Sequence, residues 1–421
     1  MTKASIKKMK NGLRIVTVPM PDNPTVTVMV MVAAGTRYET AANNGLSHFL
    51  EHMCFKGTKT RTNIQIAYEM EAMGAESNAF TSYDYTGYYA KGRSELFPKL
   101  LDLVSDIYLH STFPESEITK EAGVITGEID MIEDAPQSRV GYLFLESLYG
   151  NQPAGMPILG TKETVRSFTR DDFVNYHNQH YIAEKTVVVV AGNVSHADVV
   201  RRVARAFAEI KSGRAIAKKK IAKSSGPRVM VRNKKTDQAH LVMGCRSLPT
   251  GHPDEPAFAV MTALLGQGSS SRLFIKLREE MGAGYYVFAS HTSSNDSGEF
   301  DISTGTDPAR VPEIIRAIRG EIQNIRTDLV SAEELAKTKE YLIGRIVMGL
   351  ESSDAFAHYA GVRAVLGRPI KPLAAVERDI RAVTAADVLR VAKKYLKNGQ
   401  LHLAVMGPHD DIGEIDRAMR E

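Results

Sequence analysis

The chain has 421 residues, which is long enough for two or more domains, and its apolar (43%) and charged (24%) fractions are ordinary for a globular protein. Its 53 basic and 49 acidic residues give a net charge of +4. The basic residues do not gather into a stripe with interleaved aromatic residues, so nucleic acid is not an expected partner. The one compact basic run, Lys218–Lys220, falls in a linker-like segment and is expected to be solvated.

The two cysteines, Cys54 and Cys245, cannot form a disulfide framework and favour a reducing compartment, although a single bridge between them stays open. The first residues carry no apolar region typical of a signal peptide. The longest apolar stretch, Val26–Ala34, is about half of the ~20 residues that a membrane-spanning helix needs. We therefore expect no membrane span and a cytoplasmic location.

The first predicted elements are strands at Gly12–Pro19 and Thr25–Ala34, followed later by helices at Thr62–Met73 and Glu95–His110. Strands and helices do not alternate strictly along the chain. This order favours an α+β fold in which helices pack on one face of a mainly antiparallel sheet.

Between these elements lies a predicted helix, 46–55, that carries His48, Glu51 and His52. Residues four apart share a helix face, so His48 and His52 can reach one metal ion. Glu51 stands on the same turn, where it can take a proton from water as a general base. The order His-x-x-Glu-His is the inverzincin pattern. A polar surface helix is the alternative, but the apolar neighbours Leu46, Phe49, Leu50, Met53 and Phe55 favour a mostly buried helix.

A third ligand has to come from elsewhere, and the predicted helix Glu117–Glu133 offers one. Glu121 and Glu128 lie two turns apart on one face, so Glu128 can reach the metal while Glu121 orients a histidine. A typical acidic surface helix is the alternative at this point. Gly123 and Gly127 each cost about 1 kcal/mol against Ala in a helix, which predicts close packing against another helix.

The chain also contains an internal repeat. A helix start at Phe168–Val174 and a strand at Thr186–Ala191 return, about 215 residues later, as Val383–Leu389 and Leu401–Met406. Chance reuse of a helix–strand unit is the alternative to duplication. We predict an N-terminal domain over 1–212, a linker over 213–227 and a homologous C-terminal domain over 228–421. The two halves would form a clamshell with a cleft between them.

The stretch from Gly45 to Thr58, GLSHFLEHMCFKGT, resembles the insulinase/pitrilysin family. Within it, the chain resembles the short-chain branch that includes mitochondrial processing peptidase and its bacterial relatives. The resemblance covers nearly the whole chain. It implies one zinc ion per chain, held by His48, His52 and Glu128, with Glu121 as the family's second acidic residue.

Two further matches extend the implied site. The stretch Ser77–Thr86 resembles the family's edge strand, whose residues Asn78, Ala79, Phe80 and Thr81 would bind an extended substrate by main-chain hydrogen bonds. Arg278 and Tyr285 resemble an Arg/Tyr pair of the second half, which would hold substrate carbonyls and stabilise an oxyanion. The second half carries no metal ligands one repeat beyond the first motif.

The resemblance implies a zinc metalloendopeptidase that cleaves peptides or unfolded segments, with Glu51 activating water. It also implies a dimer of such chains. A homodimer is the simpler choice, because the zinc motif and the Arg/Tyr pair stand in one chain, and a heterodimer with a homologous chain is the alternative. The alternative function is a non-catalytic structural or partner subunit of the same fold.

Overall fold

The computed structural model describes residues 4–222, 226–409 and 412–421, which fall into two compact units. Unit 1 contains the residues up to Ile129 together with Met156–Lys219 and Met348–Leu373. Unit 2 contains Asp130–Gly155, Lys220–Val347 and the chain from Ala374 onward. The units thus differ from a contiguous division at 213–227, because each half of the chain places one segment in the other unit. Residues 223–225 of the predicted linker lie outside the described residues.

Unit 1 is built on a sheet in which the described residues form six strands in the order β1-β2-β6-β3-β5-β4. Only the β2–β6 pair is parallel among these neighbours. The strands are β1 (Ser5–Lys8), β2 (Arg14–Pro19), β3 (Thr25–Val32), β4 (Glu76–Thr81), β5 (Thr86–Arg93) and β6 (Thr186–Gly192). The helices are α1 (Leu46–Met53), α2 (Asn63–Ala72), α3 (Phe97–Leu109), α4 (Glu115–Asp134, mostly in unit 1), α6 (Lys162–Ser167), α7 (Arg170–His180), α8 (His196–Ala206) and α13 (Ser353–Val365).

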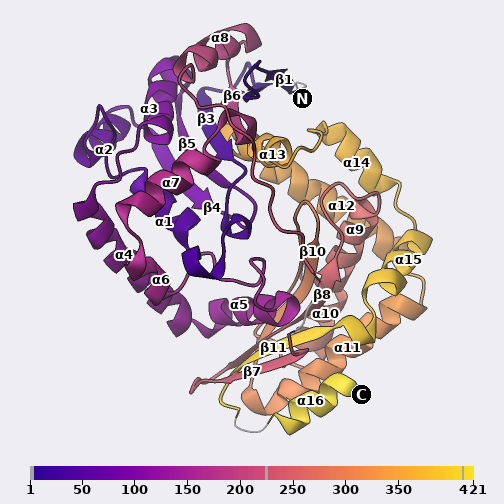
Figure 1. Ribbon diagram of the computed structural model, residues 1–421. Coiled ribbons are helices and arrows are strands. Elements are labelled where there is room, and N and C mark those ends of the chain that lie inside the picture. Colours follow the sequence, from indigo (N-terminus) through magenta and orange to yellow (C-terminus); the bar gives the residue numbers. More distant parts are fainter. Residues whose placement is uncertain (1–3, 223–225, 410–411) are drawn as a thin grey trace. The chain divides into compact units, whose positions relative to one another are not determined.

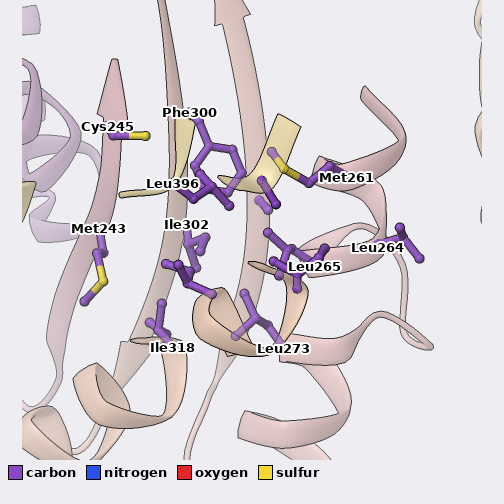
Figure 2. Packing of buried hydrophobic residues seen from close by; sticks show 14 of the residues in the cluster. Met243, Cys245, Met261, Leu264, Leu265, Leu273, Phe300, Ile302, Ile318 and Leu396 are labelled. Carbon is purple, nitrogen blue, oxygen red and sulfur yellow. The ribbon is translucent and has the colours of Figure 1, made fainter. Parts of the chain in front are cut away.

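Unit 2 has a sheet of five described strands in the order β7-β11-β8-β10-β9, in which only β7 and β11 are parallel neighbours. The strands are β7 (Val229–Asn233), β8 (Ala239–Ser247), β9 (Tyr286–Ser293), β10 (Gly298–Thr306) and β11 (His402–Gly407). The helices are α5 (Pro136–Tyr149), α9 (Glu255–Gly266), α10 (Arg272–Phe274), α11 (Val311–Thr327), α12 (Ala332–Gly349, mostly in unit 2), α14 (Leu373–Arg381), α15 (Ala385–Tyr395) and α16 (Gly413–Arg420). Figure 2 shows part of its main core, where Phe300 and Ile302 of β10 face Met261 and Leu265 of α9.

The two sheets share one topology, which confirms a duplicated α+β fold. Strands β2-β6-β3-β5-β4 correspond in order and direction to β7-β11-β8-β10-β9. The repeated helix starts also agree: Thr169 and Thr384 each form a capping box with an aspartate three residues later. Each box satisfies main-chain groups that the first turn leaves without partners.

Each sheet has its main helical layer on one face and a single helix on the other. In unit 1 the main layer covers the face of Val28 and Val30, whereas α13 covers Met29 and Met31. In unit 2 the helix α5 covers Val242 and neighbouring residues in the same way. Both helices come from the opposite half of the sequence, as their colours in Figure 1 show. The central strands are therefore buried on both faces, which explains their continuous apolar runs.

Three smaller expectations have clear outcomes. Lys219 and Lys220 of the basic run are exposed, as expected, whereas Lys218 is partly buried, with its Nζ 2.6 Å from the carboxylate of the buried Asp84. Cys54 and Cys245 are buried and free, so no bridge joins them. Among the helices of the described ranges, none has the length and hydropathy that crossing a bilayer would require. The clamshell arrangement of the two halves stays a prediction.

Candidate metal centre

Helix α1 begins at a glycine that has no side chain to cap it. Gly45 takes the left-handed φ of 97°, and a Cβ there would lie 2.7 Å from the carbonyl oxygen of Leu159. The carboxylate of Glu39, in the preceding loop, takes over the capping. It accepts hydrogen bonds from the main-chain N–H groups of Gly45 (2.8 Å) and Ser47 (2.7 Å) and from the Asn44 amide (3.0 Å). A buried carboxyl group therefore fixes the start of the helix that carries the histidines.

The structure brings His48, His52 and Glu128 together. Glu128 Oε2, on α4, lies 3.8 Å from Nε2 of each histidine, and one ligand atom from each of the three residues lies within 4.8 Å of the others. These separations are too long for hydrogen bonds. They are close to the roughly 3.4 Å between ligand atoms of a tetrahedral zinc centre with bonds of about 2.1 Å. Two imidazole nitrogens and one carboxylate oxygen therefore fit zinc and leave a fourth position open.

The protonation of the first histidine suits metal binding. Burial, with a smaller contribution from the neighbouring His52, lowers the pKa of His48 to about 3. Its ring is therefore neutral near pH 7, with a lone pair on one nitrogen. Its Nδ1 is buried and has no hydrogen-bond partner among the described residues, so the proton can reside there while Nε2 faces Glu128.

The second histidine is oriented by two charged residues. His52 Nδ1 lies 3.1 Å from Oε2 of the buried Glu121, and Lys56 Nζ lies 2.5 Å from Oε1 of the same carboxylate. Glu121 can thus accept the Nδ1 proton of His52, which directs the lone pair of Nε2 toward Glu128. Such carboxylate–histidine pairs fix the ring and raise its basicity as a ligand.

Glu51 lies beside this cluster and is 9% exposed. Burial raises the pKa of Glu51 to about 7, and the nearby Glu128 adds to this, while the Thr81 hydrogen bond and His52 act in the opposite direction. The Thr81 hydroxyl donates to Glu51 Oε2 at 2.5 Å. Glu51 is thus a carboxyl group whose pKa suits proton transfer near neutral pH.

The expected substrate strand is the edge of the unit 1 sheet. Strand β4 covers Glu76–Thr81 and pairs only with β5 in that sheet, and residues 82–85 form the turn rather than more strand. Its side chains alternate as strand geometry requires. Ala79 and Thr81 face the side of α1, whereas Phe80 packs against His358 of α13, with ring centroids 5.3 Å apart. The side chain of Asn78 is exposed, and its Oδ1 accepts a hydrogen bond from the N–H of Ala79.

Arg278 and Tyr285 lie in unit 2, and the structure places them next to each other. Arg278 stands in a π-helical turn, Ile275–Glu280 (η5). Its guanidinium donates to the carbonyl oxygens of Gly284 (3.2 Å) and Tyr285 (2.6 Å). The ring of Tyr285 is 53% exposed. Arg278 therefore holds the loop that presents the Tyr285 phenol.

Sequence reasoning did not find Glu39 or Lys56, and it named Thr81 only for its main chain. Lys56 stands within the stretch that resembles the known family, but the sequence did not show which residue it would contact. Glu39 had no local signal, because its contacts depend on the path of the loop before α1. The predicted helix bounds were close: 46–55 became Leu46–Met53, and Glu117–Glu133 became Glu115–Asp134.

Known proteins resemble this chain over nearly its whole length. Residues 14–162 match the family model described as "Insulinase (Peptidase family M16)", and residues 167–342 match "Peptidase M16 inactive domain". The chain is 36% identical over 404 residues to a protein of Bacillus subtilis named "Uncharacterized zinc protease YmxG", covering 96% of this chain and 98% of that protein. A Rickettsia felis protein named "Uncharacterized zinc protease" is 35% identical over 410 residues, covering 96% and 98%.

Solved structures show the same fold. A structure titled as a protease from Helicobacter pylori superposes with a TM-score of 0.89 at 24% identity, covering 96% of this chain and 99% of that chain. A Pseudomonas fluorescens structure titled "peptidase M16 inactive domain" gives a TM-score of 0.90 at 19% identity, covering 97% and 99%. The fold and the inverted motif define a peptidase-type protein with two homologous halves. The chain belongs to the insulinase family, peptidase family M16.

Proposed function

We propose that this protein is a zinc metalloendopeptidase that hydrolyses peptides or unfolded segments. The observation that carries the proposal is the convergence of His48, His52 and Glu128, with the buried Glu51 on the same helix. The relatives' names, which describe them as zinc proteases, support the same function.

His48, His52 and Glu128 would hold one zinc ion. When bound, zinc supplies Lewis-acid activation of a peptide carbonyl and of water. Glu51 accepts the proton of the attacking water and later passes it to the leaving amine. Glu121 keeps His52 in the tautomer that binds through Nε2.

The substrate would add to the free edge of β4 through its main chain, with Asn78, Ala79, Phe80 and Thr81 as its neighbours. By the family resemblance, Arg278 and Tyr285 would hold substrate carbonyls and stabilise the oxyanion. A homodimer is proposed on the same basis, with a heterodimer of homologous chains as the alternative.

The test is the variant Glu51→Gln in the full chain. We expect peptide hydrolysis to fall at least about 100-fold, because a general base contributes 10²- to 10⁴-fold. Zinc content, measured by elemental analysis, should stay at the wild-type value. Glu163→Gln, at an exposed position of α6, is the matched control and should keep activity.

An active Glu51→Gln variant would overturn the mechanism. A wild-type chain that binds no zinc and cleaves no peptide from a mixed library would favour the alternative, a non-catalytic subunit of the same fold. A wild-type chain that binds zinc stoichiometrically and cleaves peptides would exclude that alternative.

A further inference from the structure

A side-chain hydrogen bond joins the end of β4 to Glu51. Thr81 is the last residue of that strand, and its Oγ1 donates to Glu51 Oε2 at 2.5 Å. This length falls in the range of hydroxyl–carboxylate bonds, which are stronger than bonds between neutral groups. A glutamate carboxyl rotates broadly about its last torsion when nothing holds it. The Thr81 hydroxyl therefore restricts rotation of the Glu51 carboxyl about this torsion.

Thr81 itself is fixed by the turn that follows it. It pairs with Thr86 of β5, and Ser82 N donates to the Tyr85 carbonyl at 2.8 Å, which closes the turn. Within the turn Asp84 is 4% exposed and forms ion pairs with two cationic side chains, Arg37 at 3.4 Å and Lys218 at 2.6 Å. A buried carboxylate with two cationic partners resists displacement. The hydroxyl of Thr81 thus projects from a firmly held hairpin.

The segment Gly35–Glu39 holds both partners of this hydrogen bond. On one side, Arg37 N donates to the Tyr83 carbonyl at 2.9 Å. Gly35 lies so near the turn that a Cβ there would be 2.2 Å from Ser82 O. On the other side, Glu39 caps the start of α1, the helix that carries Glu51. The distance between Thr81 and Glu51 is therefore set by the fold of unit 1.

We propose that Thr81 is a positioning residue for Glu51, an inference that rests on the proposed peptidase function. Its hydroxyl occupies Oε2 and leaves Oε1 as the atom that accepts the proton of the attacking water, whose oxygen then bonds to the peptide carbonyl carbon. Thr81 is also the last residue of the strand proposed to bind the substrate's main chain. The same residue would therefore contact the peptide through its main chain and orient Glu51 through its side chain.

A purely main-chain role for Thr81 makes a different prediction. Valine keeps the β-branched shape, the strand preference and every main-chain group of threonine, and it removes only the hydroxyl. Serine keeps the hydroxyl and removes only the methyl group. The pair Thr81→Val and Thr81→Ser therefore separates the hydrogen bond to Glu51 from the strand contacts.

The experiment compares these variants in the zinc-loaded full chain with a fluorogenic peptide. We expect Thr81→Val to lower kcat about tenfold with KM unchanged, because a misaligned base loses part of a 10²- to 10⁴-fold contribution. Thr81→Ser should recover most of kcat. The matched control is Thr27→Val on β3, which loses a buried hydroxyl contact of 2.9 Å to Ser353 in the same unit and should leave kcat unchanged. Zinc content and the thermal midpoint are measured for every variant.

Glu51→Gln separates this inference from the proposed function. If the wild type is active and Glu51→Gln has lost at least about 100-fold of that activity, an unchanged kcat in Thr81→Val, or a rise in KM alone, overturns the role of Thr81 and leaves the peptidase function intact. Thr81→Val should also cause no further loss when Glu51→Gln is already present, since the group that it orients is gone. An additive loss in that double variant, or a wild type without hydrolysis, also overturns the inference.

Discussion

Helices α1 and α9 follow the corresponding strands β3 and β8 of the two sheets, yet they differ in chemistry. Helix α1 carries His48, Glu51 and His52. The internal offset of 215 residues carries His48 to Ala263 of α9 and His52 to Gln267, the residue directly after α9. The buried residues of α9 are almost all apolar, from Ala257 to Leu265, with Thr262 as the polar exception.

The same holds for the third ligand, since this offset carries Glu128 to Ile343, a buried residue of the unit 2 core. The fold therefore does not need histidine or glutamate side chains at these positions. In unit 2 Ala263 and Ile343 are buried in the hydrophobic core and Gln267 is half-buried. Unit 1 has two histidines and a partly exposed carboxylate, Glu128, at the corresponding positions. Burying such groups costs stability unless they have partners or bind a ligand. Metal binding by these side chains would account for the difference between the halves, and this can be tested by making α1 resemble α9.

The largest expected effect comes from the double variant His48→Ala/His52→Gln, which gives α1 the residues found 215 positions later, Ala263 and Gln267. Zinc should raise the thermal midpoint of the wild type, because a ligand that binds only the folded state stabilises it. In the double variant we expect no zinc-dependent rise and no bound zinc by elemental analysis. The midpoint of the metal-free protein should stay within a few degrees of the metal-free wild type.

His252→Ala is the control for this variant, because His252 lies in unit 2 and is remote in sequence from all three proposed ligands. It should keep the full response to zinc. If the double variant still binds one zinc ion per chain with unchanged affinity, the contrast between α1 and α9 does not reflect metal binding, and the assignment of the ligands is wrong.

A smaller effect is expected from Lys56→Met. Lys56 contacts the Glu121 carboxylate, which in turn orients His52. Helix α9 carries no proposed metal ligand, so it needs no contact of this kind. Removing a partner of this kind typically weakens metal affinity by about 10- to 100-fold. We expect a loss near the lower end, about tenfold, in a zinc-chelator competition titration, since Glu121 remains. Lys120→Met is the control. Lys120 forms an exposed ion pair with Glu117 on α4, the helix that carries Glu121, and this pair takes no part in the contacts around His52. Equal affinities for the two variants would show that Lys56 does not support the site.

Much of this architecture was predictable because its signals are local. The i,i+4 histidines specified one helix face, and the Thr169 and Thr384 caps marked the repeat. What could not be predicted depends on contacts between segments distant in sequence. Helices α5 and α13 each join the sheet of the other half, and no local pattern identifies the partner of a helix. The available signal was the nearly continuous apolar run of Val26–Val32, because such a run is typical of a strand that is covered on both faces.

Within the site, the ligands were predictable and their supports were not. His48, His52 and Glu128 follow a spacing that the sequence displays. The hydrogen bond from Thr81 to Glu51 and the cap from Glu39 depend on how the hairpin and the loop before α1 fold back, which no periodicity encodes. The same reasoning failed for the glycines of α4. It predicted close helix packing, but a Cβ added at Gly123 or Gly127 would meet no heavy atom within 4 Å among the described residues, apart from its chain neighbours and the backbone of its own helix. Packing therefore does not require these two glycines.

The smallest expected effect follows from that correction. Because the space beside both glycines is open, Gly123→Ala and Gly127→Ala should each stabilise the protein by up to about 1 kcal/mol, as alanine reduces the entropy of the unfolded chain and favours the helix. Gly344→Ala on α12 is the matched control in the other half, since a Cβ there also meets nothing within 4 Å among the described residues, and it should stabilise by a similar amount. Thermal midpoints and peptide hydrolysis are measured together. If all three variants are equally stabilised but only the α4 variants lose activity, the α4 glycines are needed for activity. Helix α4 would then have to bend, or leave room for substrate beside Glu128, whereas α12 would not. If all three variants stabilise and stay active, the glycines of α4 and α12 are equivalent, and the functional difference between the halves lies in the side chains of α1, β4 and Glu128 alone.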